Sequence, residues 1–223
     1  MERVQVVHHP AIADRLARVR AADTPVPVFR HLIEEIGTFL AYEGTRSLPL
    51  RSENVATPVG LARSERIAAR PVVAPILRAG LGLLPGFLAV VDDAIVAHLG
   101  FFRDPATFAA IPYYANLPAQ LGDAPVFVLD PMLATGHSGA AALDVLAARG
   151  AADLTFLCVI AAPEGLAHVA RRHPSVRVVA CAIDDRLNDH GYIVPGLGDA
   201  GDRMFGSASS LPDGYRADTH ITS

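Results

Sequence analysis

The sequence predicts an α/β protein whose mostly parallel sheet is flanked by helices. Two observations carry this prediction. Short apolar segments alternate along the chain with longer helical patterns, and these segments are hydrophobic throughout rather than at every second residue. Strands of a parallel sheet that is covered on both faces have this composition. The segments in question are 71–77, 126–129, 154–161 and 176–180.

Length and composition favour one well-packed domain, which we expect over residues 1–206, followed by a polar tail over 207–223. The chain has 223 residues, 51% hydrophobic and 19% charged. Its net charge of −4 gives no basic surface for a nucleic-acid polymer. No apolar run approaches the ~18 residues of a membrane span, and no signal-peptide core is present. We therefore expect a cytoplasmic protein that does not bind membranes, with Cys158 and Cys181 as buried, unpaired thiols.

The first seventy residues predict a short strand, two helices and a small antiparallel segment outside the central sheet. Residues 4–7 suit a short strand, and 11–22 suit a helix. From Val28 the apolar residues recur at helical spacing, which predicts a second helix that ends at Gly44. Residues 47–70 are mixed and Arg-rich, and we interpret them as a small antiparallel hood.

The most informative segment is 126–138, because its order of residues suits a phosphorylated sugar. A buried strand ends at Asp130, a turn of small residues follows, and a helix begins near Ser138. Unpaired N–H groups and the dipole at a helix start bind phosphate. Thr135 and Ser138 add hydroxyl donors, and Asp130 can accept hydrogen bonds from sugar hydroxyls. From the residues alone, this site and an ordinary strand–turn–helix are equally plausible.

Known nucleotide-binding motifs do not describe this segment. It holds no Gly-x-Gly-x-x-Gly, and a Gly-Lys-Ser/Thr sequence cannot occur because all 19 cationic residues are Arg. A Walker loop is therefore excluded, and a dinucleotide fold is disfavoured.

A second candidate anion site follows the strand at 71–77. Arg78 comes directly after it, and Gly80 and Gly82 follow before an apolar helix that ends near Val90. Glycine lets backbone N–H groups approach an anion, and Arg can donate to two phosphate oxygens at once. Composition alone slightly favours a plain strand–helix turn with an exposed Arg.

The third segment, 187–203, is rich in glycine and acidic residues and is therefore not expected to form a regular element. A surface loop is the simplest interpretation. However, Ile193, Val194 and Leu197 are too apolar for a loop that only contacts water.

These three segments, in this order, resemble the uracil phosphoribosyltransferase branch of the type I phosphoribosyltransferase superfamily. Asp130 to Ser138 resembles the loop that binds 5-phosphoribosyl 1-diphosphate (PRPP), with Pro131 in place of a second acid. Pro-Ile-Leu-Arg-Ala-Gly-Leu-Gly (75–82) matches the diphosphate loop, and Asn188 to Asp202 resembles the base-binding segment. The resemblance covers roughly residues 4–206. It implies a type I phosphoribosyltransferase fold with a small hood and a flexible lid.

The resemblance implies a glycosyltransferase of pyrimidine salvage that converts uracil and PRPP to UMP and diphosphate, with Mg²⁺ as cofactor. It places Arg78, Asp130 and Asp199 in positioning and charge stabilisation, with no general base assigned. Mg²⁺ would be held mainly by PRPP and water, near Asp199. The implied PRPP site comprises Arg78, Arg103, Asp130, Pro131, Met132, Leu133, Ala134, Thr135, Gly136, His137, Ser138 and Asp199. The implied uracil site comprises Ile193, Gly198, Asp199 and Ala200, mainly through main-chain groups.

Two positions depart from the family pattern. The lid expected after Arg103 continues as Pro-Ala-Thr-Phe (105–108) instead of acids and Thr-Leu. His137 stands where the family often has Gly, and a left-handed backbone there would cost on the order of 1 kcal/mol or more.

Some properties remain open from the sequence. By resemblance we expect a homodimer or a larger homo-oligomer, and GTP is a candidate effector. A non-catalytic nucleotide sensor on the same scaffold, or a transferase for another nucleobase, stays an alternative.

Overall fold

The computed structural model describes residues 3–103 and 110–206. Within them, a nine-stranded sheet has the order β1-β11-β10-β8-β4-β6-β7, with β5 beside β4 and β9 beside β10. All its pairs are parallel except β6 with β7. The strands are β1 (Val4–Val6), β4 (Val72–Leu77), β5 (Ile95–Val96), β6 (His98–Arg103), β7 (Ala110–Asn116), β8 (Val126–Leu129), β9 (Met132–Leu133), β10 (Leu154–Ala161) and β11 (Arg177–Ile183). The predicted mostly parallel sheet is confirmed.

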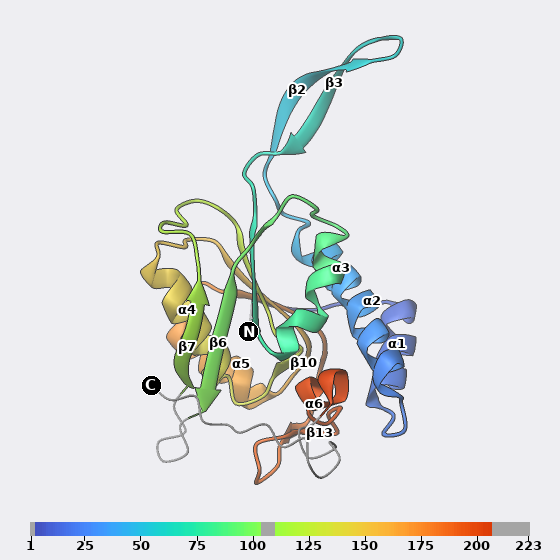
Figure 1. Cartoon of the computed structure of the whole chain (residues 1–223), viewed down its shortest axis with the longest axis vertical. Coiled ribbons are helices and arrows are strands. Elements are labelled where there is room, and N and C mark those ends of the chain that lie inside the picture. The colour runs from blue at the N-terminus through green and yellow to red at the C-terminus, as the bar shows by residue number, and fades with distance from the viewer. Residues whose placement is uncertain (1–2, 104–109, 207–223) are drawn as a thin grey trace, which may run out of the picture.

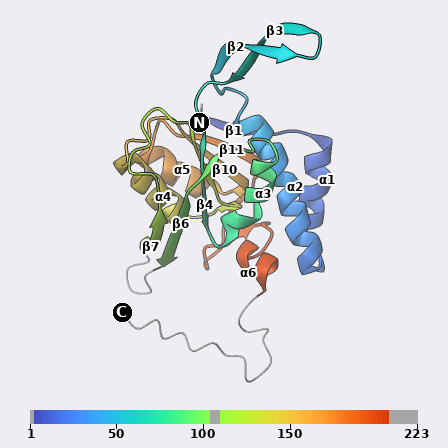
Figure 2. The same ribbon diagram turned by 45° about the horizontal axis from the view of Figure 1, so that its top comes forward.

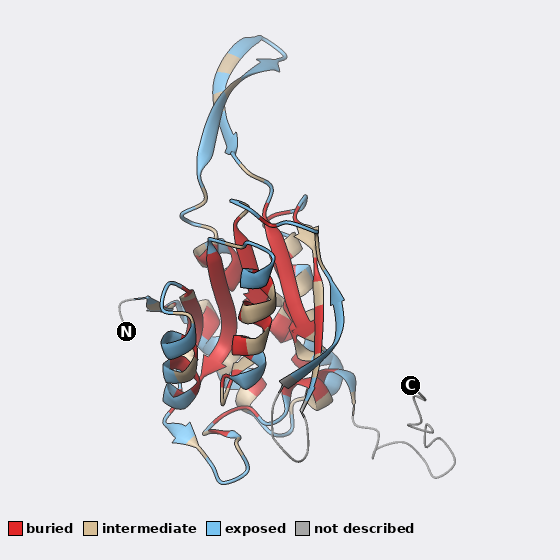
Figure 3. Cartoon of the chain, turned by 90° about the vertical axis from the view of Figure 1, so that its left-hand side faces the viewer, coloured by how far each residue is buried: buried red, intermediate tan, exposed pale blue. Residues whose placement is uncertain are grey.

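Helices cover both faces of the sheet (Figure 1). On β10, Leu157 and Val159 pack into the core on the side of α2, and Phe156 and Cys158 pack into the core on the side of α4. Alternate residues of a strand point to opposite faces, so an entirely apolar strand supplies both cores. Figure 3 shows the buried strands between the two helical layers. One layer holds α1 (Pro10–Arg20), α2 (Val26–Gly44) and α3 (Leu84–Leu88), and the other holds α4 (His137–Ala148) and α5 (Pro163–Arg172).

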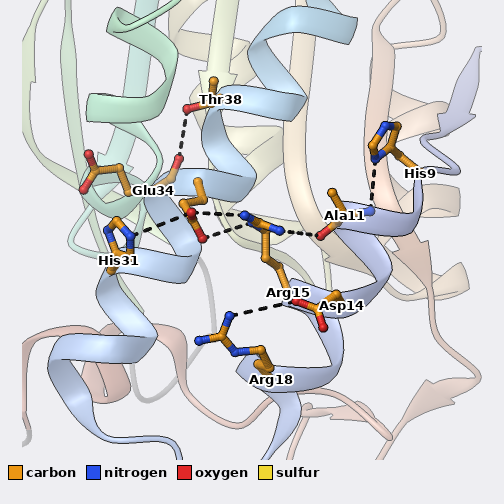
Figure 4. A network of polar contacts seen from close by, with 9 residues as sticks. His9, Ala11, Asp14, Arg15, Arg18, His31, Glu34 and Thr38 are labelled. Carbon is orange, nitrogen blue, oxygen red and sulfur yellow. Dashed lines mark hydrogen bonds and ion pairs between the residues drawn. The ribbon is translucent and has the colours of Figure 1, made fainter.

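Helices α1 and α2 are joined by an ion pair (Figure 4). Arg15 donates from Nε and Nη2 to the two carboxylate oxygens of Glu35, at 3.0 and 3.1 Å. The apolar stripe of α2 lies against the sheet, and its members Phe29, Ile33 and Ile36 are fully buried. The C-terminal end of α1 lies towards α6 (Ala200–Phe205), whose Arg203 donates to the C=O of Val19 (Figure 1).

The excursion at 47–70 is antiparallel, as predicted, but it is not a hood over the site. It is a hairpin of β2 (Leu50–Thr57) and β3 (Gly60–Ile67) that projects from the end opposite α6 (Ala200–Phe205), as Figures 1 and 2 show. A second small sheet, of β12 (Arg186–Leu187) and β13 (Ile193–Val194), lies with α6 at the carboxyl ends of the central strands. This later segment therefore takes the place expected for the hood.

The segment from 101 to 114, where the resemblance implies a lid after Arg103, forms strands in the part that the structure describes. Strands β6 and β7 continue the sheet through it, with Arg103 opposite Ala110 and a register shift after Gly100. Pro112 is tolerated because β7 is the edge strand of the sheet. The Pro105–Phe108 departure and the predicted tail at 207–223 lie outside the described residues.

Two further expectations concern the thiols and the membrane. Cys158 and Cys181 are buried and unpaired, as predicted. Burial raises the pKa of Cys181 to about 12. Among the described residues, no helix combines the length and apolar character needed to cross a membrane.

Candidate active site

A cleft of about 220 Å³ opens at the carboxyl ends of β4 and β8. The parallel pairing of these two strands brings their ends, and the loops that follow, to the same edge of the sheet. Three segments that are far apart in the chain meet there. The cleft is lined by Ile76, Leu77, Arg78, Ala79, Phe101, Asp130, Ser138, Asp199 and Gly201.

The loop after β4 forms the first wall of the cleft. Its short 3₁₀ helix, η1 (Ala79–Gly82), follows a cis peptide bond between Leu77 and Arg78. A Cβ atom at Gly80 would collide with the carbonyl oxygen of Leu129, so glycine is required where this loop passes the end of β8. The guanidinium of Arg78 donates to Asp202 Oδ1 at 3.1 Å.

The loop after β8 forms the second wall and begins helix α4. Gly136 caps this helix in the left-handed conformation, with φ +81°. His137 is the first helical residue, so the positive φ falls on Gly136 and the backbone cost considered for His137 does not arise. A Cβ at Gly165 would collide with the carbonyl oxygens of Leu133 and Ala134, so α5 packs directly beneath this loop.

Side chains of this loop form a small polar cluster. The Nδ1 atom of His137 lies 3.0 Å from Thr135 Oγ1, and its ring meets that of His168 edge-on at 4.8 Å between centroids. Burial, and then the neighbouring His137, lowers the pKa of His168. The hydroxyl of Thr135 is thus held beside the start of α4, where we expected the phosphate.

Asp130 stands at the tip of β8 between the two walls. Its Oδ1 accepts a hydrogen bond from the backbone N–H of Met132 at 3.4 Å. Burial of the carboxyl raises the pKa of Asp130 to about 7, and the negative charge of Asp199 adds to the rise against the opposing effect of the Met132 bond. A carboxyl poised near neutral pH inside a cleft is typical of a functional site.

The third wall comes from the segment 187–203, which is more regular than expected. Asn188 Oδ1 accepts from the N–H groups of His190 and Tyr192, and this builds the turn between β12 and β13. Helix α6 begins after Asp199, whose Oδ1 accepts from the N–H of Asp202 at 2.8 Å. The start of α6 at this cap was not predicted, because Gly198 and Gly201 on either side of it are unfavourable in a helix.

The main chain of Ile193 exchanges no hydrogen bonds with Leu187, its opposite residue in the β12–β13 pair. Asn188 N donates to Tyr192 O at 2.8 Å, so these residues form a hydrogen-bonded pair of the antiparallel ladder. The next pair, Leu187 with Ile193, is then a non-hydrogen-bonded pair, whose N–H and C=O groups point away from the partner strand.

The structure brings together the side chains of Arg78, Asp130, Ser138 and Asp199 on the wall of one cleft. Arg103 is the last residue of β6, and its side chain lies outside the described part. Pro131 to Gly136 form the turn between β8 and α4, where β9 pairs with β10. Gly198 adjoins the cleft residue Asp199, while Ile193 and Ala200 are buried in the core on the side of α2.

Four residues of this region were missed from the sequence. Asp202, at the end of the segment that resembles the base-binding segment, was not predicted to contact another site residue, and it accepts a hydrogen bond from Arg78. Arg203 donates to the carbonyl oxygens of Val19, Ala21 and Leu197. Arg20 and Asp184 form an ion pair beside Gly196. Partners 164 positions apart leave no local pattern in a sequence, so no signal could have found this pair.

Comparisons with known proteins agree with this arrangement. A family model described as Uracil phosphoribosyltransferase matches residues 6–207. The chain is 48% identical over 208 residues to the protein named uracil phosphoribosyltransferase of Geobacillus kaustophilus, covering 93% of this chain and 100% of that one. It is 45% identical over 208 residues to the protein of that name from Streptococcus agalactiae serotype III, with the same coverage.

Solved structures show the same fold. The AQ2163 protein from Aquifex aeolicus is 37% identical with a TM-score of 0.87, and the match covers 91% of this chain and 98% of that one. Adenine phosphoribosyl transferase from Trypanosoma brucei, at 12% identity, has a TM-score of 0.56 over 82% of this chain and 84% of that one.

Proposed function

Since this chain belongs to the uracil phosphoribosyltransferase family, we propose that the cleft between β4, β8 and α6 is where it transfers a 5-phosphoribosyl group from PRPP to uracil. The chain is a glycosyltransferase that forms UMP and diphosphate. One observation carries the location of the site: Arg78, Asp130, Ser138 and Asp199, from three separate segments, line the same cleft.

The reaction replaces one bond at C1′ of the ribose by another. The bond from C1′ to the diphosphate oxygen breaks, N1 of uracil bonds to C1′, and the N1 proton passes to solvent. Negative charge grows on the leaving diphosphate, and Arg78 is placed to stabilise it. Arg103 is assigned the same role by resemblance. No side chain is assigned as a general base.

The sugar phosphate is assigned to the 130–138 loop. The left-handed Gly136 caps α4, whose first N–H groups are assigned to the 5′-phosphate, with Thr135 and Ser138 adding hydroxyl donors. The N–H of His137 makes only a long bond, 3.5 Å, to Thr135 Oγ1, which the phosphate would replace. Asp130, when ionised, accepts from the ribose hydroxyls. Holding the sugar at both ends supplies much of the rate acceleration through positioning.

Uracil is assigned to the segment from Ile193 to Ala200. The edge of uracil presents alternating acceptors and donors, and rigid main-chain groups can match this pattern. The outward N–H and C=O groups of Ile193, and the left-handed Gly198 next to the cleft, support this assignment. Asp199 is assigned to the side that faces the ribose diphosphate.

Mg²⁺ is proposed as the cofactor, held mainly by PRPP and water. The described residues contain no cluster of three side chains that could hold a metal on their own. Mg²⁺ at phosphate sites is bound by phosphate oxygens, waters and one or two carboxylates. Asp199 fits this minor part because its N-cap bond uses only Oδ1. When bound, the ion neutralises charge on the diphosphate.

We propose a homodimer or larger homo-oligomer in which another copy covers the β2–β3 hairpin. A two-stranded hairpin alone is marginal in water, and this one exposes large apolar side chains. Leu50 is 56% exposed, Leu61 80% and Val59 98%. Sedimentation of the full chain and of L61D should show a dissociated variant. An unchanged mass would contradict the role of the hairpin.

The test of function is turnover with labelled uracil and PRPP at defined Mg²⁺. UMP formation that requires both substrates is the expected result, and binding of uracil or UMP without turnover would instead favour the sensor. Cytosine and hypoxanthine in competition test the base. A GTP response is proposed on the resemblance alone, and turnover with and without GTP tests it.

We also propose a cytoplasmic location, a reducing compartment in which unpaired thiols such as Cys158 persist.

A further inference from the structure

Asp184, directly after β11, is a buried carboxylate that none of the chemistry above uses. It is 6% exposed, so its charge must be compensated inside the protein. Arg20, at the last turn of α1, supplies this compensation with two bonds: Nη2 to Oδ1 at 2.6 Å and Nη1 to Oδ2 at 2.7 Å. A bidentate pair of this kind fixes the orientation of both groups.

The Arg20–Asp184 ion pair also binds the backbone of Gly196, which lies in the segment 193–200 assigned to uracil. Asp184 Oδ2 accepts from the N–H of Gly196 at 2.9 Å, and Arg20 Nη1 donates to the C=O of Gly196 at 2.7 Å. Both main-chain polar groups of Gly196 are therefore held by charged partners. Gly196 has φ +65° and lies two residues before Gly198.

A second arginine holds the next residue. Arg203, on α6, donates from Nη1 to the C=O of Leu197 at 2.7 Å and to the C=O of Val19. Its Nη2 donates to the C=O of Ala21, and its guanidinium lies 4.2 Å from the ring centre of Phe29. The end of α1 is thus joined to Gly196 through Arg20 and to Leu197 through Arg203.

A purely structural role, which only docks α1 on the sheet, is the simpler interpretation. Buried ion pairs are often neutral for stability compared with apolar packing, so stability alone explains this arrangement poorly. The bonds instead converge on the three consecutive peptide units from Pro195 to Gly198, which lead into the main-chain groups of Gly198 to Ala200 assigned to uracil. Small errors in such groups are costly because main-chain recognition has no flexible side chain to adjust.

We propose that Arg20, Asp184 and Arg203 are positioning residues that set the base specificity of the cleft by fixing the Gly196–Leu197 backbone. This inference rests on the proposed assignment of uracil to residues 193–200. It predicts that disturbing the ion pair affects the base much more than PRPP, because Arg78 and the 130–138 loop have no part in it.

Arg15 offers a matched control on the same helix. It also pairs bidentately with a carboxylate on another element, and its side chain is 24% exposed, as is that of Arg20. R15M and R20M therefore remove equivalent side chains, and only R20M removes bonds to the base segment. R20K keeps the positive charge but cannot donate to both carboxylate oxygens in the planar geometry of a guanidinium. It serves as the milder variant if R20M fails to fold.

Steady-state kinetics and amide hydrogen exchange, measured on all three variants, test the proposal. R20M should raise KM for uracil at least tenfold, change KM for PRPP less than threefold, and lower the preference for uracil over cytosine. Faster amide exchange at residues 196–200 should accompany this in R20M, to a smaller extent in R20K, and not in R15M. R15M should leave all of these unchanged and should lose less Tm than R20M, because Glu35 is 31% exposed whereas R20M leaves the 4% exposed Asp184 side chain without its partner.

Two outcomes overturn the inference. One is an R20M variant whose KM for uracil and loop exchange match those of R15M. The other is an equal rise in KM for both substrates, which indicates a general structural role. If the wild-type chain makes no UMP, the proposed function fails, and the exchange measurement still decides whether Arg20 fixes the loop.

Discussion

The guanidinium of Arg78 and the carboxylate of Asp202 lie 3.1 Å apart across the mouth of the cleft, although 124 residues separate them in the chain. This pair joins the loop assigned to diphosphate with the helix that follows the segment assigned to uracil. Both side chains are about half exposed, so the pair contributes at most about 1 kcal/mol to folding. Its importance lies in where it holds Arg78.

Removing the charge of Asp202 should strengthen PRPP binding. The carboxylate competes with diphosphate for Arg78, and an opposing unit charge at about 4 Å in water is worth ~1 kcal/mol. D202N should therefore lower KM for PRPP about three- to fivefold and leave the free energy of unfolding nearly unchanged. D14N, which removes a carboxylate paired with Arg18 on α1, is the control. A higher KM for PRPP in D202N would mean that Asp202 orients Arg78 instead.

The pKa of Asp130, raised to about 7, should appear in the pH profile. Below that pH the carboxyl is protonated and loses acceptor capacity for the ribose hydroxyls. The value of kcat/KM for PRPP should therefore fall as pH drops through about 7. D130N should be slower at every pH and should show only the titration of PRPP itself. An inflection near pH 7 that survives in D130N would assign it to another group.

The same pKa shift should affect stability with the opposite sign to that of a salt-bridged acid. Between pH ~4 and ~7 the native state holds a proton on Asp130 that the unfolded chain has lost, so stability falls as pH rises through this window. The loss is about 4 kcal/mol at most. Urea unfolding at pH 4 and pH 8 should show D130N gaining relative to the wild type at the higher pH. An equal difference at both pH values would contradict the raised pKa.

Gly136 should be essential for the phosphate turn. An alanine there must adopt φ +81°, and its Cβ would come within 2.9 Å of the Gly165 carbonyl oxygen. G136A should lose more than tenfold in kcat/KM for PRPP and about 1–3 kcal/mol in stability. G122A is the matched control, because Gly122 has φ +54° with open space around it. It should lose about 1–2 kcal/mol with unchanged kinetics; equal kinetic losses in both variants would argue against a phosphate turn.

His137 should be replaceable by glycine at modest cost. The phosphate is assigned to backbone N–H groups, which H137G keeps, while the contacts with Thr135 and His168 are lost. H137G should lower Tm and keep kcat/KM for PRPP within about threefold. A tenfold loss would show that the imidazole itself contacts the phosphate.

The sequence could predict those features of the fold and the site that are determined by residues close together in the chain. The strand Leu154–Ala161 was predicted to the residue because its continuous apolar run is a local property. The three binding segments could be found because each carries its own residues. The direction of the β2–β3 hairpin could not, since the Arg-rich sequence 47–70 specifies pairing but not where it points. The strands β6 and β7 on either side of the expected lid were not predicted, because Pro112 is unusual in a strand and is accommodated only since β7 is an edge strand.

The dependence of the Gly196–Leu197 backbone on the end of α1 has a consequence for synthesis on the ribosome. A nascent chain that has reached residue 150 already contains every residue assigned to PRPP except Asp199, but its acceptor pocket awaits a segment some forty residues further along. That late segment must then dock onto a helix made among the first residues of the chain. Fragments cut short before residue 206 should therefore be unable to complete the transfer, however well their sheet is formed.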